Sequence, residues 1–425
     1  MKMAYPADGG PLRPELASAQ AAGSAPPGPA DYPRARIPTK PVLSRASFSL
    51  RGHRAPSILD AREARFVTSG RVAIALALRS MGVGPGDRVL VPSYHCASMI
   101  EPVIWSGATP VFYRIHADTA VNLDDVASKL GQGAKVLMAT HYFGFPQNLT
   151  VLRAFCDAHG LQLLEDCAHA FLGEHQGQPL GSFGDYAIAS SMKFFPIYDG
   201  GCLVSARHSL APVALHSAGL GFEAKMVFNA LEDGFEYGRL SLLQRLLSVP
   251  LGLKNLLWGQ IKHRRPAVAM SVAPGSSQGG FGFDPAWLTK RSSLFSRLML
   301  RLVSRARMGD LRRQHYLRLQ AALAGLPGCR PLHPVLPEGT YPWVFPLICD
   351  DPEPLFRSLK SDGVPIIRFA EYLWPGVDAS VCPHSMALSR HVLQFPCHQE
   401  LLDAELAWMI DKITAALLAL QKPAP

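Results

Sequence analysis

The chain has 425 residues, of which 48% are hydrophobic and 18% charged, so it can bury a large core as one α/β unit or as two or three domains. Its net charge of +9 favours anionic partners, but the basic residues are scattered and no nucleic-acid-binding signature occurs, so no nucleic acid is expected among them. No run of 18 apolar residues is present, which excludes a membrane-spanning helix.

The first 41 residues are rich in Pro, Ala and Gly, and no apolar segment follows the basic start. Residues 1–41 therefore predict a disordered arm and not a secretory signal. The eight cysteines are dispersed, mostly within apolar segments, and none shows CxxC spacing. This pattern predicts reduced, buried thiols in a cytoplasmic protein, and no metal is expected.

From residue 66 onward, apolar strands alternate with helices. The predicted elements are a helix at 72–82, a strand at 87–93, a helix at 98–107, strands at 109–115 and 134–141, a helix at 149–160 and a strand at 161–166. This alternation is typical of βαβ units on a mostly parallel sheet. Ligands bind such sheets beyond the carboxyl ends of the strands, where Ser93, His141 and Asp166 are predicted to lie.

Two further strands, at 185–191 and 201–206, bracket Lys193 and place it on a loop between them. Past residue 285 the spacing predicts one long helix over 292–326. Strands and helices follow it, as expected for a smaller C-terminal α/β domain.

Three residues together indicate a pyridoxal phosphate site. Lys193 stands beside "FFP", and burial among apolar side chains favours the neutral amine that Schiff-base chemistry needs, although a snorkelling surface lysine is the alternative. Asp166 ends an apolar strand and could keep a pyridine nitrogen protonated, although an aspartate there is commonly a cap or turn residue. Gly70 opens a helix whose N–H groups could hold a phosphate.

Several ordered motifs resemble the DegT/StrS-type sugar aminotransferases, which are fold-type I pyridoxal phosphate enzymes. The stretch from "SGRVAIALALRSMGVGPGDRVLVPSYHC" to "SGATPVFYRI" resembles their opening block, and "EDCAHAFLGEHQGQPLGSFGDYAIASS" resembles their "EDAAQA…GSFGD…S" block. "KFFPIYDGG" is similar to the lysine segment of one branch, and "YPWVFPL", "GVPIIRFAEYLWPG" and "VLQFPCHQEL" are similar to C-terminal elements. The resemblance covers about residues 37–415.

The resemblance implies a fold-type I aminotransferase-like large domain with a mostly parallel sheet, plus a smaller C-terminal α/β domain. The expected parts are the arm at 1–41, a large cofactor-binding domain at 42–290 with an insert near 207–280, and the long helix with the small domain at 291–425.

The resemblance also implies the site residues. Lys193 corresponds to the Schiff-base lysine and Asp166 to the carboxylate under the pyridine nitrogen. His169 occupies a position beside the cofactor hydroxyl, whereas a satisfied core histidine is the alternative without the motif. Tyr94 or His95 is expected to stack on the flat face of the ring.

The phosphate is expected among Gly70, Arg71 and Ser190. Ser191 is an alternative to Ser190, because the spacing from "GD" to the lysine is two residues shorter than in one branch of the family. The resemblance implies a two-fold homodimer, but the family's "N-Y-R" segment, which reaches the neighbouring subunit's site, is not recognisable here; "FGFDPAWLTKRSS" stands near that place.

The insert contains "RLSLLQRLLSVPLGLKNLLWGQIKHRR", in which leucines recur at helical spacing before a basic cluster. An amphipathic helix packed on the protein or at a dimer seam is favoured over peripheral contact with an anionic membrane.

The expected function is an aminotransferase that uses pyridoxal 5'-phosphate to move an amino group, by resemblance usually from L-glutamate, to a keto sugar nucleotide for glycan or polysaccharide biosynthesis. Relatives that remove a hydroxyl carry histidine at the lysine position, so Lys193 argues against that outcome. The alternatives are an aminotransferase of a cyclitol or other carbonyl compound, and a non-catalytic binding protein of the same pathway. A binding protein has no need of the lysine nucleophile.

Overall fold

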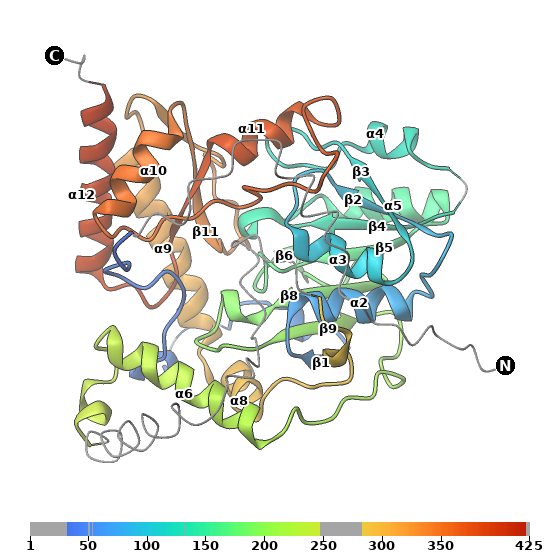
Figure 1. The fold of residues 1–425 in the computed structure, drawn as a ribbon, viewed down its shortest axis with the longest axis horizontal. Helices are drawn as coiled ribbons and strands as arrows, with labels where there is room; N and C mark the ends of the chain where they lie inside the picture. Colours follow the sequence, from blue (N-terminus) through green and yellow to red (C-terminus); the bar gives the residue numbers. More distant parts are fainter. Residues whose placement is uncertain (1–31, 50–51, 53, 132, 247–282, 422–425) are drawn as a thin grey trace, which may run out of the picture.

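The computed structural model describes residues 32–421, apart from 50–51, 53, 132 and 247–282 (Figure 1). Most of the expected arm and the second half of the insert, with Trp258 and the basic cluster after it, lie outside the described residues. The last part of the expected arm, residues 32–41, contacts the C-terminal part of the chain. Arg36 N–H donates to the Gly363 carbonyl at 2.9 Å, and Ile37 is buried.

The large sheet has seven strands in the order β1-β9-β8-β5-β4-β2-β3. Their bounds are β1 Glu63–Val67, β2 Arg88–Pro92, β3 Thr109–Tyr113, β4 Ala134–Thr140, β5 Gln162–Asp166, β8 Tyr186–Ser190 and β9 Gly201–Ser205. The five strands from β8 to β3 are parallel, whereas β9 pairs antiparallel with β8 and β1. The predicted mostly parallel α/β sheet is confirmed. A separate two-stranded ribbon, β6 (Glu174–His175) and β7 (Gln178–Pro179), lies between β5 and β8 in the chain.

Helices α2 (Gly70–Ser80), α3 (Ala97–Trp105), α4 (Leu123–Ser128) and α5 (Leu149–His159) connect the first strands, as Figure 1 shows. The Ser69 hydroxyl caps α2 by accepting the Val72 N–H at 3.4 Å, so the helix begins at Gly70. Residues 71–78 are all buried, which makes α2 a central packing element between α3 and the strands β8 and β9. The start of α2 is therefore held firmly beside the sheet.

The predicted long helix over 292–326 is instead two helices, α8 (Leu294–Leu302) and α9 (Arg305–Leu323). Val303 is extended, and the Ser304 side chain caps α9 by accepting the Arg307 N–H. The Ser304 N–H donates to the Ser47 carbonyl at 2.8 Å, so a tertiary contact holds the break. The helical periodicity of the sequence runs across this break and does not reveal it.

The C-terminal part forms a three-stranded antiparallel sheet in the order β10-β11-β12. Its elements are β10 Cys329–Pro331, β11 Val344–Cys349, α10 Pro352–Ser361, α11 Pro383–His391, β12 Val392–Pro396 and α12 Asp403–Leu420. Figure 1 places α10 and α12 on one side of the molecule and the large sheet with α2 to α5 on the other. The long helix α9 contacts α12, β10 and β11.

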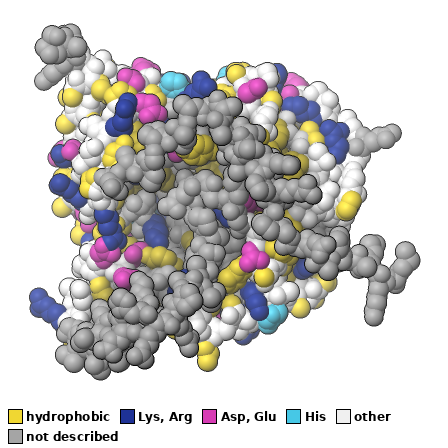
Figure 2. Space-filling view, in the orientation of Figure 1, with side chains coloured by type: hydrophobic (Ala, Val, Ile, Leu, Met, Phe, Trp, Pro, Cys, Tyr) yellow, Lys and Arg dark blue, Asp and Glu magenta, His cyan; other side chains and the backbone are white. Residues whose placement is uncertain are grey.

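The described part of the insert contains α6 (Leu220–Glu236), which packs against α8, and a helical turn at 241–246. Within the described residues, no helix is long and apolar enough to cross a bilayer. On the described part of the face in Figure 2, Lys and Arg side chains lie among Asp and Glu. All eight cysteines lie in the described part of the chain and are unpaired.

Candidate cofactor site

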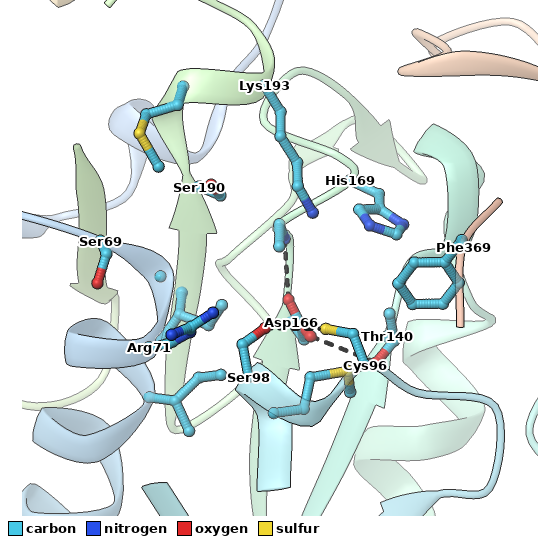
Figure 3. Close-up of a pocket in the computed structure, with 16 residues that line it drawn as sticks. Ser69, Arg71, Cys96, Ser98, Thr140, Asp166, His169, Ser190, Lys193 and Phe369 are labelled. Carbon is cyan, nitrogen blue, oxygen red and sulfur yellow. Dashed lines mark hydrogen bonds between the residues drawn. The ribbon is translucent and has the colours of Figure 1, made fainter. Parts of the chain in front are cut away.

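A pocket lies at the carboxyl ends of β4, β5 and β8, beside the first turns of α2 and α3 (Figure 3). Its lining comprises Ser69, Gly70, Arg71, Ile74, Cys96, Ser98, Met99, Thr140, Asp166, Ala168, His169, Ile188, Ser190, Met192, Lys193 and Phe369. This is the place where parallel α/β sheets bind ligands, because the strand ends and helix starts leave backbone groups available there. Six of the nine sequence-predicted site residues line it.

Lys193 ends a short 3-10 turn, η5 (Ser191–Lys193), between β8 and β9. Its side chain points into the pocket toward Asp166 (Figure 3), and its Nζ lies 4.5 Å from the centre of the Trp343 ring. Burial lowers the pKa of the Lys193 amine, while nearby acidic groups, Cys96 and Asp166, oppose that shift. Burial is the largest of these effects, and it favours the neutral, nucleophilic form of the amine.

Asp166 ends β5, and its side chain is buried beneath Lys193. One carboxylate oxygen, Oδ1, accepts the Ala168 N–H at 2.9 Å, and the Thr140 hydroxyl lies 3.5 Å from Oδ2. Burial raises the pKa of this carboxyl. A cationic N–H donor facing Oδ2 would favour the ionised form, so the site fits a protonated ring nitrogen.

His169 lies beside Lys193 and is held between aromatic rings. Its ring stacks on Trp343 at a centroid distance of 4.1 Å and meets the edge of Phe369 at 4.7 Å. Its Nδ1 lies 3.5 Å from the Phe143 N–H. Burial and the Lys193 charge lower the pKa of His169 well below its usual value, which favours a neutral imidazole facing the pocket.

Arg71 and Ser190, two of the expected phosphate residues, lie across the pocket from His169 and Phe369 (Figure 3), and the third, Gly70, also lines the pocket. The first N–H groups of α2 have no partner within the helix, and their dipole favours an anion. Strand β9 runs so close that a Cβ on Gly201 would lie 2.3 Å from the Ser69 carbonyl oxygen, so glycine is required there. This close approach brings the helix start and Ser190 to the same wall.

The two serines considered for the phosphate have different surroundings. Ser190 lines the pocket, and its side chain makes no capping hydrogen bond to η5. Ser191 is fully buried outside the lining, with its Oγ 3.4 Å from the Cys202 Sγ. The geometry favours Ser190.

Neither residue considered for stacking on the ring, Tyr94 or His95, lines the pocket. Tyr94 packs within an aromatic cluster, and its hydroxyl donates to the Phe369 carbonyl at 3.4 Å. His95 stacks on Phe112, and its Nε2 accepts the Trp374 N–H at 2.9 Å; burial lowers its pKa to about 4. The chain instead brings Cys96 to the pocket.

Sequence reasoning missed several lining residues, chiefly Cys96, Ser98, Thr140, Met192 and Phe369. Thr140 had a usable signal, because it ends β4 next to the strand that ends at Asp166. Phe369 had no such sequence signal, because it belongs to the C-terminal part of the chain, far from the other lining residues in sequence.

Behind the pocket, His141, Glu165 and Cys167 place possible metal-ligand atoms within 4.8 Å of one another. The Glu165 carboxylate already accepts N–H groups from Gly181 at 2.9 Å and Phe183 at 2.8 Å. His141 accepts the Gln147 N–H at Nδ1 and faces Glu165 with Nε2 at 3.4 Å. These hydrogen bonds explain the cluster as a structural support for the strand ends.

Comparisons with known proteins agree with this geometry. Residues 56–244 match the DegT/DnrJ/EryC1/StrS aminotransferase family. A GDP-perosamine synthase of Vibrio cholerae is 35% identical over 150 residues, which are 35% of this chain and 41% of that protein. An L-glutamine:2-deoxy-scyllo-inosose aminotransferase of Streptomyces kanamyceticus is 33% identical over 147 residues, 34% of each chain. The chain thus spans less than half the length of these curated relatives.

Among solved structures, the Spr1654 protein of Streptococcus pneumoniae in its PLP form superposes with a TM-score of 0.62 and 18% identity. The match covers 91% of this chain and all of that one, which extends the shared fold well beyond the family match. The fold-type I aminotransferase-like architecture expected from the sequence is confirmed. The sequence match to the DegT/DnrJ/EryC1/StrS aminotransferase family thus covers residues 56–244, and the fold shared with solved structures extends over most of the chain.

Proposed function

We propose that this protein is a pyridoxal phosphate-dependent aminotransferase that moves an amino group, by resemblance from L-glutamate, to a nucleotide-linked keto sugar in glycan or polysaccharide biosynthesis. The observation that supports this most is the convergence of Lys193 and the buried Asp166 in one pocket whose other end is the start of α2. We place the protein in the cytoplasm, consistent with eight unpaired cysteines in the described part.

The residues present fit the cofactor at both ends. Asp166 offers a buried carboxylate oxygen for a ring N–H, and the α2 start with Arg71 and Ser190 offers donors for a phosphate. His169 and Cys96 also line the pocket. Bound pyridoxal phosphate supplies an aldehyde that holds the amino group and a ring that withdraws electrons from the substrate carbon.

Each residue then has a defined task. Lys193 holds the cofactor and, once released by the amino donor, moves a proton to and from the substrate carbon as general base and acid. Asp166 keeps the ring nitrogen protonated. The half-buried Trp343 ring and the buried Phe369 ring limit the access of water to the Lys193 amine, which preserves its reactivity.

The acceptor is proposed from the relatives. GDP-perosamine synthase, by its name, makes a nucleotide-linked amino sugar, and the positive net charge of this chain suits a nucleotide diphosphate. A cyclitol acceptor is the second candidate, because another relative is named for an inosose substrate. A non-catalytic binding role would leave the buried Lys193 amine without a use.

The proposal is tested with the purified protein and pyridoxal phosphate. Borohydride reduction followed by digestion and mass spectrometry is expected to find the cofactor on Lys193, and modification of another lysine would contradict the proposal. A panel of keto sugar nucleotides and inososes, offered to the protein loaded with pyridoxamine phosphate, then identifies the acceptor class.

Ser190→Ala is expected to weaken pyridoxal phosphate binding by about 10- to 150-fold, because one hydrogen bond to a charged group contributes about 1.5–3 kcal/mol. Ser191→Ala should change the Kd little, since its hydroxyl faces Cys202 and not the pocket. Equilibrium dialysis of both variants makes the comparison. A larger loss from Ser191→Ala would reverse the assignment.

A homodimer is also proposed, and α8 supports it. Leu294, Leu298 and Leu302 follow one another at four-residue spacing and are 52%, 41% and 54% exposed, which leaves an apolar stripe for a second copy. Leu298→Glu is expected to dissociate the dimer in sedimentation experiments, whereas Leu317→Glu, at an exposed leucine of α9, should not. A fully active wild-type monomer at the assay concentration would contradict the proposal.

A further inference from the structure

Arg312, in the middle of α9, is a fully buried arginine next to the candidate site. Its exposed fraction is 0%, and it is among the largest completely buried side chains of the described residues. Burying a guanidinium is costly unless its donors are well satisfied. The hydrogen-bond partners of the Arg312 side chain therefore indicate its structural role.

The guanidinium donates mainly to backbone carbonyls. Nη2 donates to the Lys193 carbonyl at 3.2 Å, and Nη1 donates to the carbonyls of Pro342 at 3.1 Å and Trp343 at 3.0 Å. Nε donates to Gln399 Oε1 at 3.0 Å. Among the described residues, none of these hydrogen-bond partners is a carboxylate, and burial lowers the pKa of Arg312 to about 10.

Gln399 completes the contact with the lysine turn. Its Nε2 donates to the Phe194 carbonyl at 2.9 Å, and the Phe194 ring lies under the Arg312 guanidinium at 4.4 Å. The carbonyls of Lys193 and Phe194 end a single 3-10 turn, where the helix itself provides no donors. Arg312 and Gln399 supply those donors from two elements distant in the sequence.

The same guanidinium also fixes the opposite wall of the lysine's environment. Trp343, whose carbonyl it binds, places its ring 4.5 Å from the Lys193 Nζ and stacks on His169 at 4.1 Å. The Arg312 guanidinium thus holds both the backbone of Lys193 and the backbone of Trp343, the residue whose ring lies beneath the Lys193 amine.

We propose that Arg312 is a positioning residue that, with Gln399, sets the place and direction of the Lys193 side chain by holding the carbonyls of Lys193 and Trp343. The inference rests on the proposed function, because it assigns a residue to the reaction of that same lysine. A lysine at position 312 keeps the charge but cannot reach all four acceptors, because its ammonium is a point charge and not a planar fork.

The test compares Arg312→Lys with Arg305→Lys. Arg305 lies two turns earlier on α9, is also buried, and binds Asp60 with both Nη atoms at 2.8 and 2.9 Å, away from the pocket. Each full-length variant is mixed with pyridoxal phosphate, and three readouts are taken: the melting temperature, the rate at which borohydride-fixed cofactor accumulates on Lys193, and the pH midpoint of the bound cofactor's visible absorbance.

Both variants should melt at a lower temperature than the wild type. Only Arg312→Lys should slow attachment to Lys193, by about tenfold or more, and only it should shift the pH midpoint, because a purely structural loss leaves the environment of the amine unchanged. Gln399→Leu should show the same two changes to a smaller degree, and it serves as the test variant if Arg312→Lys does not fold. If folded Arg312→Lys attaches the cofactor as fast as the wild type and shows the same pH midpoint, this inference alone is wrong. If the wild-type protein itself never attaches the cofactor to Lys193, both the proposed function and this inference are wrong.

Discussion

Lys193→Ala is expected to lower the rate of amino transfer from glutamate by at least about 10⁴-fold, the upper range for losing one acid–base group, because this variant also lacks the nucleophile. The variant should still fold and bind pyridoxal phosphate more weakly, since Asp166, Arg71 and Ser190 remain in the pocket. Stopped-flow absorbance of the half-reaction measures the rate, and equilibrium dialysis measures the binding.

Lys360→Ala is the matched control. The Lys360 amine also lies over an aromatic ring, 5.5 Å from the centre of Phe356, and burial also lowers its pKa. It sits on α10, away from the pocket, so its removal should leave the half-reaction unchanged. A Lys193→Ala variant that transfers amino groups within tenfold of the wild type would exclude the proposed role.

Asp166→Ala is expected to slow the same half-reaction by about 10²-fold, the scale of losing one preorganised electrostatic contact. Without the carboxylate, the ring nitrogen has no buried anion to keep it protonated, so the ring withdraws electrons less effectively. Cofactor attachment to Lys193 should persist and be detectable by borohydride reduction and mass spectrometry. The combination of intact attachment and slow transfer is the signature of this role.

Asp185→Ala provides the comparison for Asp166. Asp185 accepts the Leu163 N–H at 2.8 Å and pairs with Arg153 at 2.8 Å, at the opposite end of β5 from Asp166. Its loss should lower the melting temperature and leave the transfer rate near that of the wild type. If Asp185→Ala slowed amino transfer as much as Asp166→Ala does, the proposed role of Asp166 would be contradicted.

Much of the large sheet could be predicted from the sequence because its signals are local. Continuous apolar runs such as "RVLVP" and "QLLED" appear as β2 and β5, since strands buried on both faces need no polar alternation. Strand β1, "EARFV", was not predicted, because only one of its five residues is fully buried and its pattern is weak. It joins the sheet through antiparallel pairing with β9, a contact between residues distant in the sequence.

The sequence by itself determined the candidate groups of the proposed site: an amine on an apolar turn, a carboxylate at a strand end and a glycine at a helix start, each recognisable from its immediate neighbours. The tertiary structure alone decided which nearby side chains reach the pocket. Cys96 lines it while Tyr94 and His95 turn away, and Ser190 faces it while Ser191 does not. The directions of adjacent side chains on irregular segments depend on packing. Phe369, Trp343 and Arg312 lie far from Lys193 in the sequence, and no local sequence pattern indicates that they contact its surroundings.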